Sequence, residues 1–299
     1  MTRILVIPGI GDIHWVALKL RSFCQVYGIT DPEVWVWNFD GRPRSLDYVR
    51  RLPFVSTGEY WNQGFTEDLR RQFTDCYMTG TADVVRGFSG FDFFICPNGS
   101  LRQGKQLATE ILPECTTEWD YPLEATDGEL AYGDAQLARG KYVLLYFSDQ
   151  GMFRTWLQAW PVARVAQFID HVHRLLPSYR LLLTGSSWDA MFARNLLPLV
   201  SAPIANLVGM TTLEQLLGLI RYASAFAGWC GGNTIIATHL KTPTYMLWSD
   251  YFCAAMQTNW VDPAKIGSIY HCDTVRAVGA IAAANRVSRI VQENPCQHP

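Results

Sequence analysis

Charged residues are scarce in this chain of 299 residues: Asp, Glu, Lys and Arg make up 17% of it, and the formal net charge is −2. So small a net charge gives no general electrostatic case for binding nucleic acid or a membrane surface. The eight cysteines include no Cys-x-x-Cys pair, which argues against a zinc site and fits reduced thiols. No apolar run has transmembrane length, and no charged leader precedes the first expected strand. We therefore expect a cytoplasmic protein without a transmembrane segment.

Apolar residues are abundant by contrast: they make up 49% of the chain and include 11 Trp, enough for two domains of ordinary size. Strand-like and helix-like segments alternate throughout, which is the pattern of parallel sheets covered by helices. Strands are expected at 4–7, 33–39, 91–96, 142–147, 180–184, 204–208, 225–227 and 243–248, and helices at 14–26, 66–77, 101–112, 162–176, 188–197, 213–223, 235–240 and 274–292.

The acidic stretch 116–140 reads as an interdomain linker. The alternation therefore predicts an α/β protein with two Rossmann-like, doubly wound domains, residues 1–137 and 138–299. Their carboxyl-end loops would face a central cleft. The C-terminal helix could pack back on the first domain.

The most informative motif is the turn Cys230-Gly231-Gly232-Asn233-Thr234, which joins an expected strand to an expected helix. Adjacent glycines give the backbone unusual conformational freedom there, and the N–H groups of a helix N-terminus attract an anion. Asn233 or Thr234 could cap the helix or donate a hydrogen bond. A nucleotide diphosphate is the expected ligand, and a tight turn without a ligand is the alternative.

Three successive strands of the second half also end in small polar loops, which carry hydroxyls, the Arg154 guanidinium and Met210. Hydroxyls and guanidinium groups bind phosphate well, and a methionine can lie against a flat base. The predicted donor-binding residues are Ser148, Arg154, Thr184, Gly185, Ser186, Gly209, Met210, Thr211, Gly231, Gly232, Asn233 and Thr234.

The loop after the first strand reads Gly9-Ile10-Gly11-Asp12-Ile13-His14. His14 stands where a dinucleotide fingerprint requires its third glycine, so NAD is disfavoured. Asp12 is expected to point toward the cleft or to serve as an N-cap, and the two roles can coexist. Aromatic and basic side chains of this half suit a sugar or phosphorylated acceptor. The predicted acceptor-binding residues are Gly11, Trp15, Asp40, Arg42, Trp61 and Asn98.

Several motifs resemble those of one enzyme family. They are Trp160-Pro161, Leu182 to Asp189, Asn206 to Leu213, and Gly232 followed by Pro243-Thr244, with Gly11-Asp12 in the first half. The second half resembles the nucleotide-sugar domain of GT-B glycosyltransferases, most closely family 9, which includes the ADP-heptose heptosyltransferases. The resemblance implies a nucleoside diphosphate sugar in the second domain, an acceptor in the first, and inversion at the anomeric carbon. It also implies that Asp12 is the general base, with His14 in reserve.

Three positions depart from that family. Cys230-Gly231-Gly232 replaces its usual Asp-Thr-Gly, Ile235 stands at a family histidine, and Gln158 stands at a family lysine, which leaves Arg154 as a substitute cation. Heptose specificity is therefore not carried over.

We predict a glycosyltransferase of the hexosyl- or heptosyltransferase type that uses a nucleoside diphosphate sugar, no cofactor and no metal, since no Asp-x-Asp motif occurs. A glycan is the favoured acceptor, and a modified DNA base, a lipid-linked glycan or a protein side chain stays open. The alternative functions are a sugar-nucleotide epimerase or hydrolase, an NAD-dependent oxidoreductase, and an inactive binding or structural protein.

Overall fold

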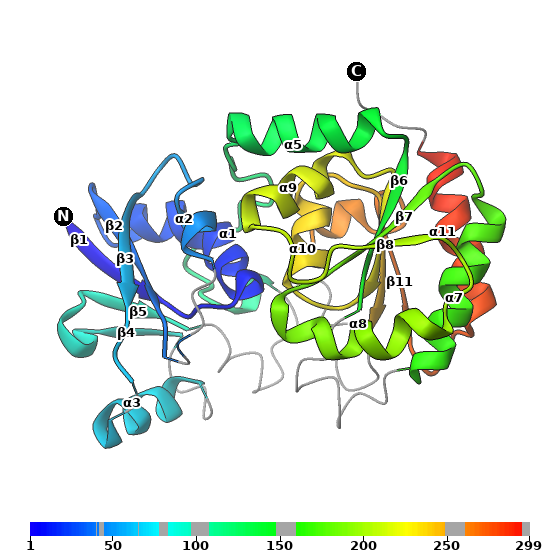
Figure 1. The fold of residues 1–299 in the computed structure, drawn as a ribbon. Helices are drawn as coiled ribbons and strands as arrows, with labels where there is room; N and C mark the ends of the chain where they lie inside the picture. Colours follow the sequence, from blue (N-terminus) through cyan, green and yellow to red (C-terminus); the bar gives the residue numbers. More distant parts are fainter. Residues whose placement is uncertain are drawn as a thin grey trace. The chain divides into compact units, whose positions relative to one another are not determined.

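The computed structural model describes residues 1–39, 41, 45–64, 66–77, 83–96, 108–147, 160–248 and 261–294. The chain forms two compact units, of which the first comprises Met1–Ala125 and the second begins at Thr126 (Figure 1). Each unit is an α/β structure with its own sheet, as expected from the alternating pattern. Within the described ranges, no helix combines the length and apolar character needed to cross a membrane.

The first unit has a five-stranded sheet in the order β3-β2-β1-β5-β4. Its strands are β1 (Thr2–Val6), β2 (Pro32–Trp37), β3 (Ser56–Trp61), β4 (Val84–Arg86) and β5 (Phe93–Ile95). All neighbours pair in parallel except β4, which runs antiparallel to β5 at the edge. In this sheet, the sequence did not predict β3 and β4, which are its two edge strands.

The helices of the first unit are α1 (Ile10–Val26), α2 (Leu46–Val49) and α3 (Glu67–Tyr77), with 3-10 turns at Phe88–Gly90 and Ala108–Glu110. One sheet face packs its aromatic side chains around Trp37, whose ring lies 5.4 Å from Phe73 of α3 and 5.5 Å from Phe88. Helix α1 contacts β1 and α2 contacts β2. Both faces of β2 are therefore covered.

The second unit has a six-stranded, all-parallel sheet in the order β11-β10-β9-β6-β7-β8. The strands are β6 (Tyr142–Tyr146), β7 (Arg180–Thr184), β8 (Ile204–Asn206), β9 (Ala225–Trp229), β10 (Thr244–Trp248) and β11 (Tyr270–Thr274). Numbered from β6, this is the strand order of dinucleotide-binding folds, in which the winding reverses between the first and fourth strands. The doubly wound prediction is confirmed, and the reversal lies between β6 and β9.

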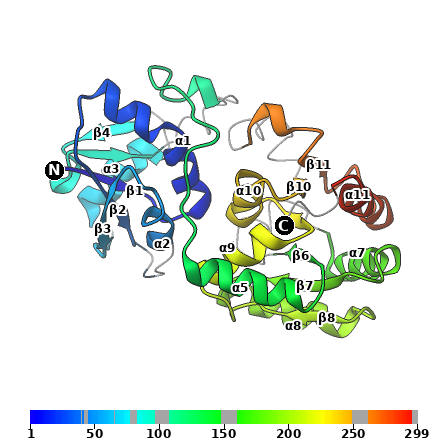
Figure 2. The same ribbon diagram turned by 90° about the horizontal axis from the view of Figure 1, so that it is seen from above.

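Helices cover both faces of this sheet (Figure 2). One face carries α7 (Val162–Leu175), α8 (Ala190–Leu196) and α11 (Ala280–Glu293). The other face carries α9 (Leu213–Tyr222) and α10 (Gly232–His239), and α5 (Asp127–Ala138) packs on α9. Ala283, Val287 and Ile290 of α11 share one core cluster with β6 and α7. The expectation that the C-terminal helix packs on the first domain is therefore wrong, because its apolar face belongs to the second unit's core.

The boundary between the units also differs from the expected one after residue 137, because α5 belongs to the second unit. Thr126 caps this helix by accepting a hydrogen bond from the Glu129 N–H. Helices α5 and α9 approach closely, since a Cβ on Gly218 would lie 2.3 Å from the Glu129 carbonyl oxygen. The fully buried Glu129 carboxylate forms an ion pair with Arg221 of α9. Half of the stretch that reads as a linker is thus a packed helix.

Candidate functional site

Two loops hold the predicted catalytic and phosphate-binding residues, and each follows a strand at the switch point of its own sheet. In open parallel sheets, ligands bind beyond the carboxyl ends of the strands where the winding reverses. The Cys230–Gly232 turn follows β9, which borders β6. In the first unit, β1 pairs with both β2 and β5 and leads into α1, which carries Asp12. The topology thus places both predicted groups at ligand-binding positions of their units.

Glycine at position 231 is favoured for a reason other than the expected one. Gly231 is the N-cap of α10 with φ 179° and ψ 171°, an extended conformation open to any residue. Gly232 is the first helical residue, and neither glycine is among those with positive φ. A Cβ on Gly231, however, would lie only 3.0 Å from Cε1 of Tyr146. Close packing against Tyr146, and not backbone freedom, therefore favours glycine at this position.

The turn presents backbone donors at the helix N-terminus. The N–H groups of Thr234 and Ile235 both donate to the Gly231 carbonyl, each at 3.1 Å. Within the described part of the chain, the N–H groups of Gly231, Gly232 and Asn233 have no acceptor. The helix dipole adds partial positive charge at the same point. Three N–H groups are thus available for an anion.

The two polar side chains after the glycines behave differently. Asn233 is 7% exposed, and its amide makes no hydrogen bond within the described ranges, so it is available as a ligand donor. Thr234 is fully buried, and its hydroxyl donates to the Trp229 carbonyl at 2.7 Å. The prediction that the Thr234 side chain binds the donor is therefore wrong, because its proton already serves the backbone of β9.

The loops after β7 and β8 contact each other. The Gly209 N–H donates to the Gly185 carbonyl at 2.9 Å. Gly209 has φ +71°, and a Cβ there would lie 3.1 Å from Cα of Ser187, so conformation and packing both require glycine. Met210 follows with 69% of its surface exposed. It is accordingly free to lie against a flat ligand, and half-buried Thr211 comes next in this loop.

Thr184 and Ser186 have local roles in the β7 loop. Ser186 forms a capping box with buried Asp189, whose Oδ2 accepts the Ser186 N–H at 2.8 Å. The Thr184 hydroxyl oxygen is fully buried and has no hydrogen-bond partner among the described residues. Because Thr184 is buried, its side chain is not exposed to a nucleotide sugar in this conformation. Its hydroxyl could still form a hydrogen bond.

Asp12 is the third residue of α1, and the N-cap is Gly9. The N-cap interpretation of Asp12 is therefore wrong. Its carboxylate instead lies against Gly9, since a Cβ on Gly9 would fall 2.0 Å from Asp12 Oδ2. Asp12 and the neighbouring Gly11 are half-buried and follow β1 at the switch point of its sheet.

His14 is 1% exposed, and its Nδ1 lies 2.7 Å from the Tyr121 hydroxyl. Tyr121 also bonds to the Tyr48 hydroxyl, and burial together with Tyr48 raises the pKa of Tyr121 well above its ordinary value. The phenol therefore stays protonated. A buried histidine in this network does not present a base to an acceptor, so the geometry disfavours His14 as the reserve base.

The predicted acceptor residues are only partly accessible. Trp15 is fully buried and its indole Nε1 has no hydrogen-bond partner in the described part, so the prediction that it contacts an acceptor is wrong. Trp61 is half-buried, with its ring 5.2 Å from Trp37 and 5.4 Å from Phe91. Asp40, Arg42, Asn98, Ser148 and Arg154 lie outside the described residues.

Tyr146, the last residue of β6, is the residue of this edge that sequence reasoning missed. It is half-buried and contacts the Gly231 position. The parallel order of β6 and β9 brings together residues that are 85 positions apart. No local sequence pattern reports such a contact.

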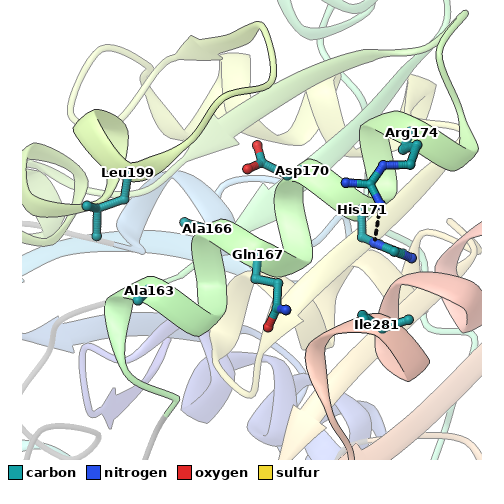
Figure 3. Close-up of a pocket in the computed structure, with 8 residues that line it drawn as sticks. All are labelled: Ala163, Ala166, Gln167, Asp170, His171, Arg174, Leu199 and Ile281. Atoms are coloured by element: carbon teal, nitrogen blue, oxygen red, sulfur yellow. Dashed lines mark hydrogen bonds between the residues drawn. The ribbon is translucent and has the colours of Figure 1, made fainter.

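A pocket of about 390 Å³ lies elsewhere in the second unit, between α7, Leu199 and Ile281 of α11. Figure 3 shows it, with Arg174 Nη1 3.3 Å from His171 Nδ1. The Asp170 carboxylate accepts the N–H groups of Ser201 and Ala202, each at 2.8 Å. None of the predicted site residues lines this pocket. In the described part of the chain, no cluster of three or more His, Cys, Asp and Glu could hold a metal ion.

No protein-family model matches this sequence, and no curated protein matches it either. Solved structures do match over almost the whole chain. Escherichia coli ADP-heptose LPS heptosyltransferase II shares 15% identity with it over 98% of this chain and 99% of its own, at a TM-score of 0.66. A family 9 glycosyl transferase from Veillonella parvula shares 10% identity over 98% of both chains, at a TM-score of 0.65.

This chain has the GT-B fold. The E. coli heptosyltransferase WaaC with ADP also matches, with 12% identity over 98% of this chain and 100% of its own and a TM-score of 0.51. The resemblance to family 9 GT-B glycosyltransferases is thereby confirmed for the fold. At identities of 10% to 15%, this similarity supports the fold. The chemistry has to be argued from the residues of this chain.

Proposed function

We propose that this GT-B chain is an inverting, metal-independent glycosyltransferase of the hexosyl- or heptosyltransferase type, which moves a sugar from a nucleoside diphosphate sugar to an acceptor hydroxyl. The observation that carries the proposal is the row of three N–H groups at Gly231, Gly232 and Asn233, which have no acceptor among the described residues. They stand at the switch point of a sheet with nucleotide-binding strand order. A diphosphate has the charge and the acceptor oxygens to use all of them.

In the proposed reaction, an acceptor oxygen attacks the anomeric carbon from the face opposite the diphosphate. The bond between that carbon and the diphosphate oxygen breaks, and its electron pair remains on the leaving diphosphate. The acceptor proton passes to the Asp12 carboxylate, a transfer that contributes about 10²- to 10⁴-fold. Because the leaving group gains negative charge, fixed N–H dipoles at the turn stabilise the transition state more than the bound donor.

Cys230 supports an anion at this turn. Burial, with a smaller contribution from Cys272, raises the pKa of the Cys230 thiol above its ordinary value, so the thiol is neutral at neutral pH. The family that the motifs resemble usually carries an aspartate at this position. A neutral thiol places no negative charge beside the leaving diphosphate, which leaves the potential of the helix N-terminus uncompensated.

The metal-independent mechanism is supported by the lack of an Asp-x-Asp motif in the sequence. The described loop segments 184–189, 207–212 and 230–234 contain no Lys or Arg, so we assign the cation of the site to Arg154. A glycan is the proposed acceptor. Among the described residues, we propose Gly11 and Trp61 as its binding residues. The scattered cysteines support the proposed cytoplasmic location.

The first test is calorimetric titration of the protein with ADP, UDP, GDP, CDP and NAD. ADP heads the panel because one structure of the same fold contains it. Binding of a nucleoside diphosphate supports the proposal. Binding of NAD alone contradicts it and favours the oxidoreductase, and binding of no nucleotide favours an inactive protein.

The second test addresses the base. Asp12→Asn should lower transfer turnover by about 10²-fold or more, the range for a lost general base, while donor affinity stays near the wild-type value. Mass spectrometry of the donor with glycan, nucleic-acid and peptide acceptors measures the product. Full transfer activity in Asp12→Asn would exclude Asp12 as the base, and release of free sugar without an acceptor would indicate a hydrolase.

A further inference from the structure

Tyr146 stands at the switch point of the second sheet. Its register partners are Gly228 on β9 and Thr184 on β7. The side chain is half-buried, and its ring centroid lies 6.5 Å from that of Phe226 on β9. The ring therefore lies on the β9 side of β6, on the same side as the turn that begins α10.

Tyr146 occupies the space that a Cβ would need at two glycines, Gly228 and Gly231. A Cβ on Gly228 would lie 1.9 Å from the Tyr146 carbonyl oxygen. A Cβ on Gly231 would lie 3.0 Å from Tyr146 Cε1 and 3.5 Å from its hydroxyl oxygen. The ring thus fills the space that a side chain at position 231 would occupy. It carries a hydroxyl to the N-terminus of α10.

We propose that Tyr146 binds the donor diphosphate: its hydroxyl donates a hydrogen bond to the phosphate held by the N–H groups of Gly231, Gly232 and Asn233. This inference rests on the function proposed above. A phenol hydroxyl bonded to a charged phosphate forms a charge-assisted hydrogen bond, which is stronger than one between neutral groups. Tyr146 thereby supplies the side-chain hydroxyl that glycine at position 231 lacks.

The Tyr146 hydroxyl matters because the described loop segments 184–189, 207–212 and 230–234 contain no basic residue. Neutral donors hold the anion on this part of the edge, so the loss of one should be measurable. Because the leaving diphosphate gains charge in the transition state, the Tyr146 hydrogen bond strengthens there. Its removal should therefore lower kcat as well as affinity.

The test compares Tyr146→Phe with Tyr142→Phe. Tyr142 lies on the same strand and the same sheet face, and its buried hydroxyl donates to the Leu219 carbonyl at 2.8 Å. Both substitutions remove one hydroxyl and keep the ring, so Tyr142→Phe controls for a loss of folding stability. The probes are the nucleoside diphosphate that binds the wild type, inorganic pyrophosphate, and the matching nucleoside without phosphate.

Tyr146→Phe should weaken binding of the nucleoside diphosphate and of pyrophosphate by about tenfold, the effect of one hydrogen bond to a charged group. Nucleoside binding should not change, and Tyr142→Phe should bind all three probes like the wild type. Unchanged diphosphate affinity in Tyr146→Phe would overturn the inference and leave the proposed function standing. An equal loss for diphosphate and nucleoside would assign Tyr146 a structural role. A wild type that binds no nucleoside diphosphate would overturn the proposed function, and this inference with it.

Discussion

Substitution of Gly231 by alanine tests the packing of the turn and its function together. The backbone at Gly231 is extended, so alanine adds no conformational strain, and the whole cost comes from the new methyl group. That methyl would lie 3.0 Å from Tyr146 Cε1, and an ordinary carbon–carbon contact is about 3.5 to 4.0 Å. The tyrosine ring must therefore shift by roughly half an ångström.

The Tyr146 ring is half-buried and can rotate partly toward solvent, so the cost should be at the low end of the overpacking range, about 1 kcal/mol. For a unit of this size we expect the melting temperature to fall by about 2 to 4 °C. The displaced hydroxyl should also lower diphosphate affinity by about tenfold.

Differential scanning calorimetry and titration of the nucleotide measure the two effects. The double variant Gly231→Ala, Tyr146→Ala supplies the control, because without the ring the added methyl has nothing to contact. Alanine at 231 should then cost almost nothing relative to Tyr146→Ala alone. A penalty of the same size in both backgrounds would refute the contact as its cause.

Two further substitutions test other contacts. Gly9→Ala places a methyl 2.0 Å from Asp12 Oδ2, so it should displace the carboxylate and reduce turnover as Asp12→Asn does, with donor affinity unchanged in titration; normal turnover would contradict the proposed base. Burial raises the pKa of the Cys24 thiol to about 11, so the unfolded chain loses this proton first, and stability present below pH of about 8.5 is lost as pH rises toward 11. Urea unfolding over that range should show a shallower decline for Cys24→Ala, and identical slopes would argue against a raised thiol pKa.

The central strands of both sheets could be predicted from the sequence because they are buried on both faces. β6 and β9 consist of apolar residues and β7 has three consecutive leucines, and the structure places these strands close to the expected ranges. Besides the short β4, the strands β3 (Ser-Thr-Gly-Glu-Tyr-Trp) and β11 (Tyr-His-Cys-Asp-Thr) were missed. Both are edge strands, whose polar and exposed positions hide the apolar pattern.

Helix α5 was missed for a different reason. Its sequence begins Asp-Gly-Glu and contains a second glycine, Gly133, so polarity and glycine content both indicate a linker. Its docking on α9 depends on this glycine, because a Cβ on Gly133 would lie 2.3 Å from the Tyr222 ring. Contacts of this kind depend on the missing side chain of glycine, so they produce no hydrophobic periodicity in the sequence.

The loops of the candidate site could be chosen from the sequence, but the side-chain packing around them could not. The glycine turn and Asp12 lie at switch points, as strand order requires. The reason for Gly231 lies in Tyr146, and the burial of His14 and Trp15 depends on residues from other elements. Sequence spacing identifies which residues share a loop, but it does not identify which side chains from distant strands fill the space beside them.

The close packing of α5 on α9 decides where this chain can be divided. A fragment that begins at residue 138 loses the Glu129 carboxylate that pairs with Arg221. It also exposes the surface of α9 around Gly218, against which α5 packs. A fragment that begins at Thr126 keeps the N-cap of α5, the Glu129–Arg221 ion pair and the contact between α5 and α9. The nucleotide-binding half therefore includes its own leading helix, and expression of this half alone requires a start at or before Thr126.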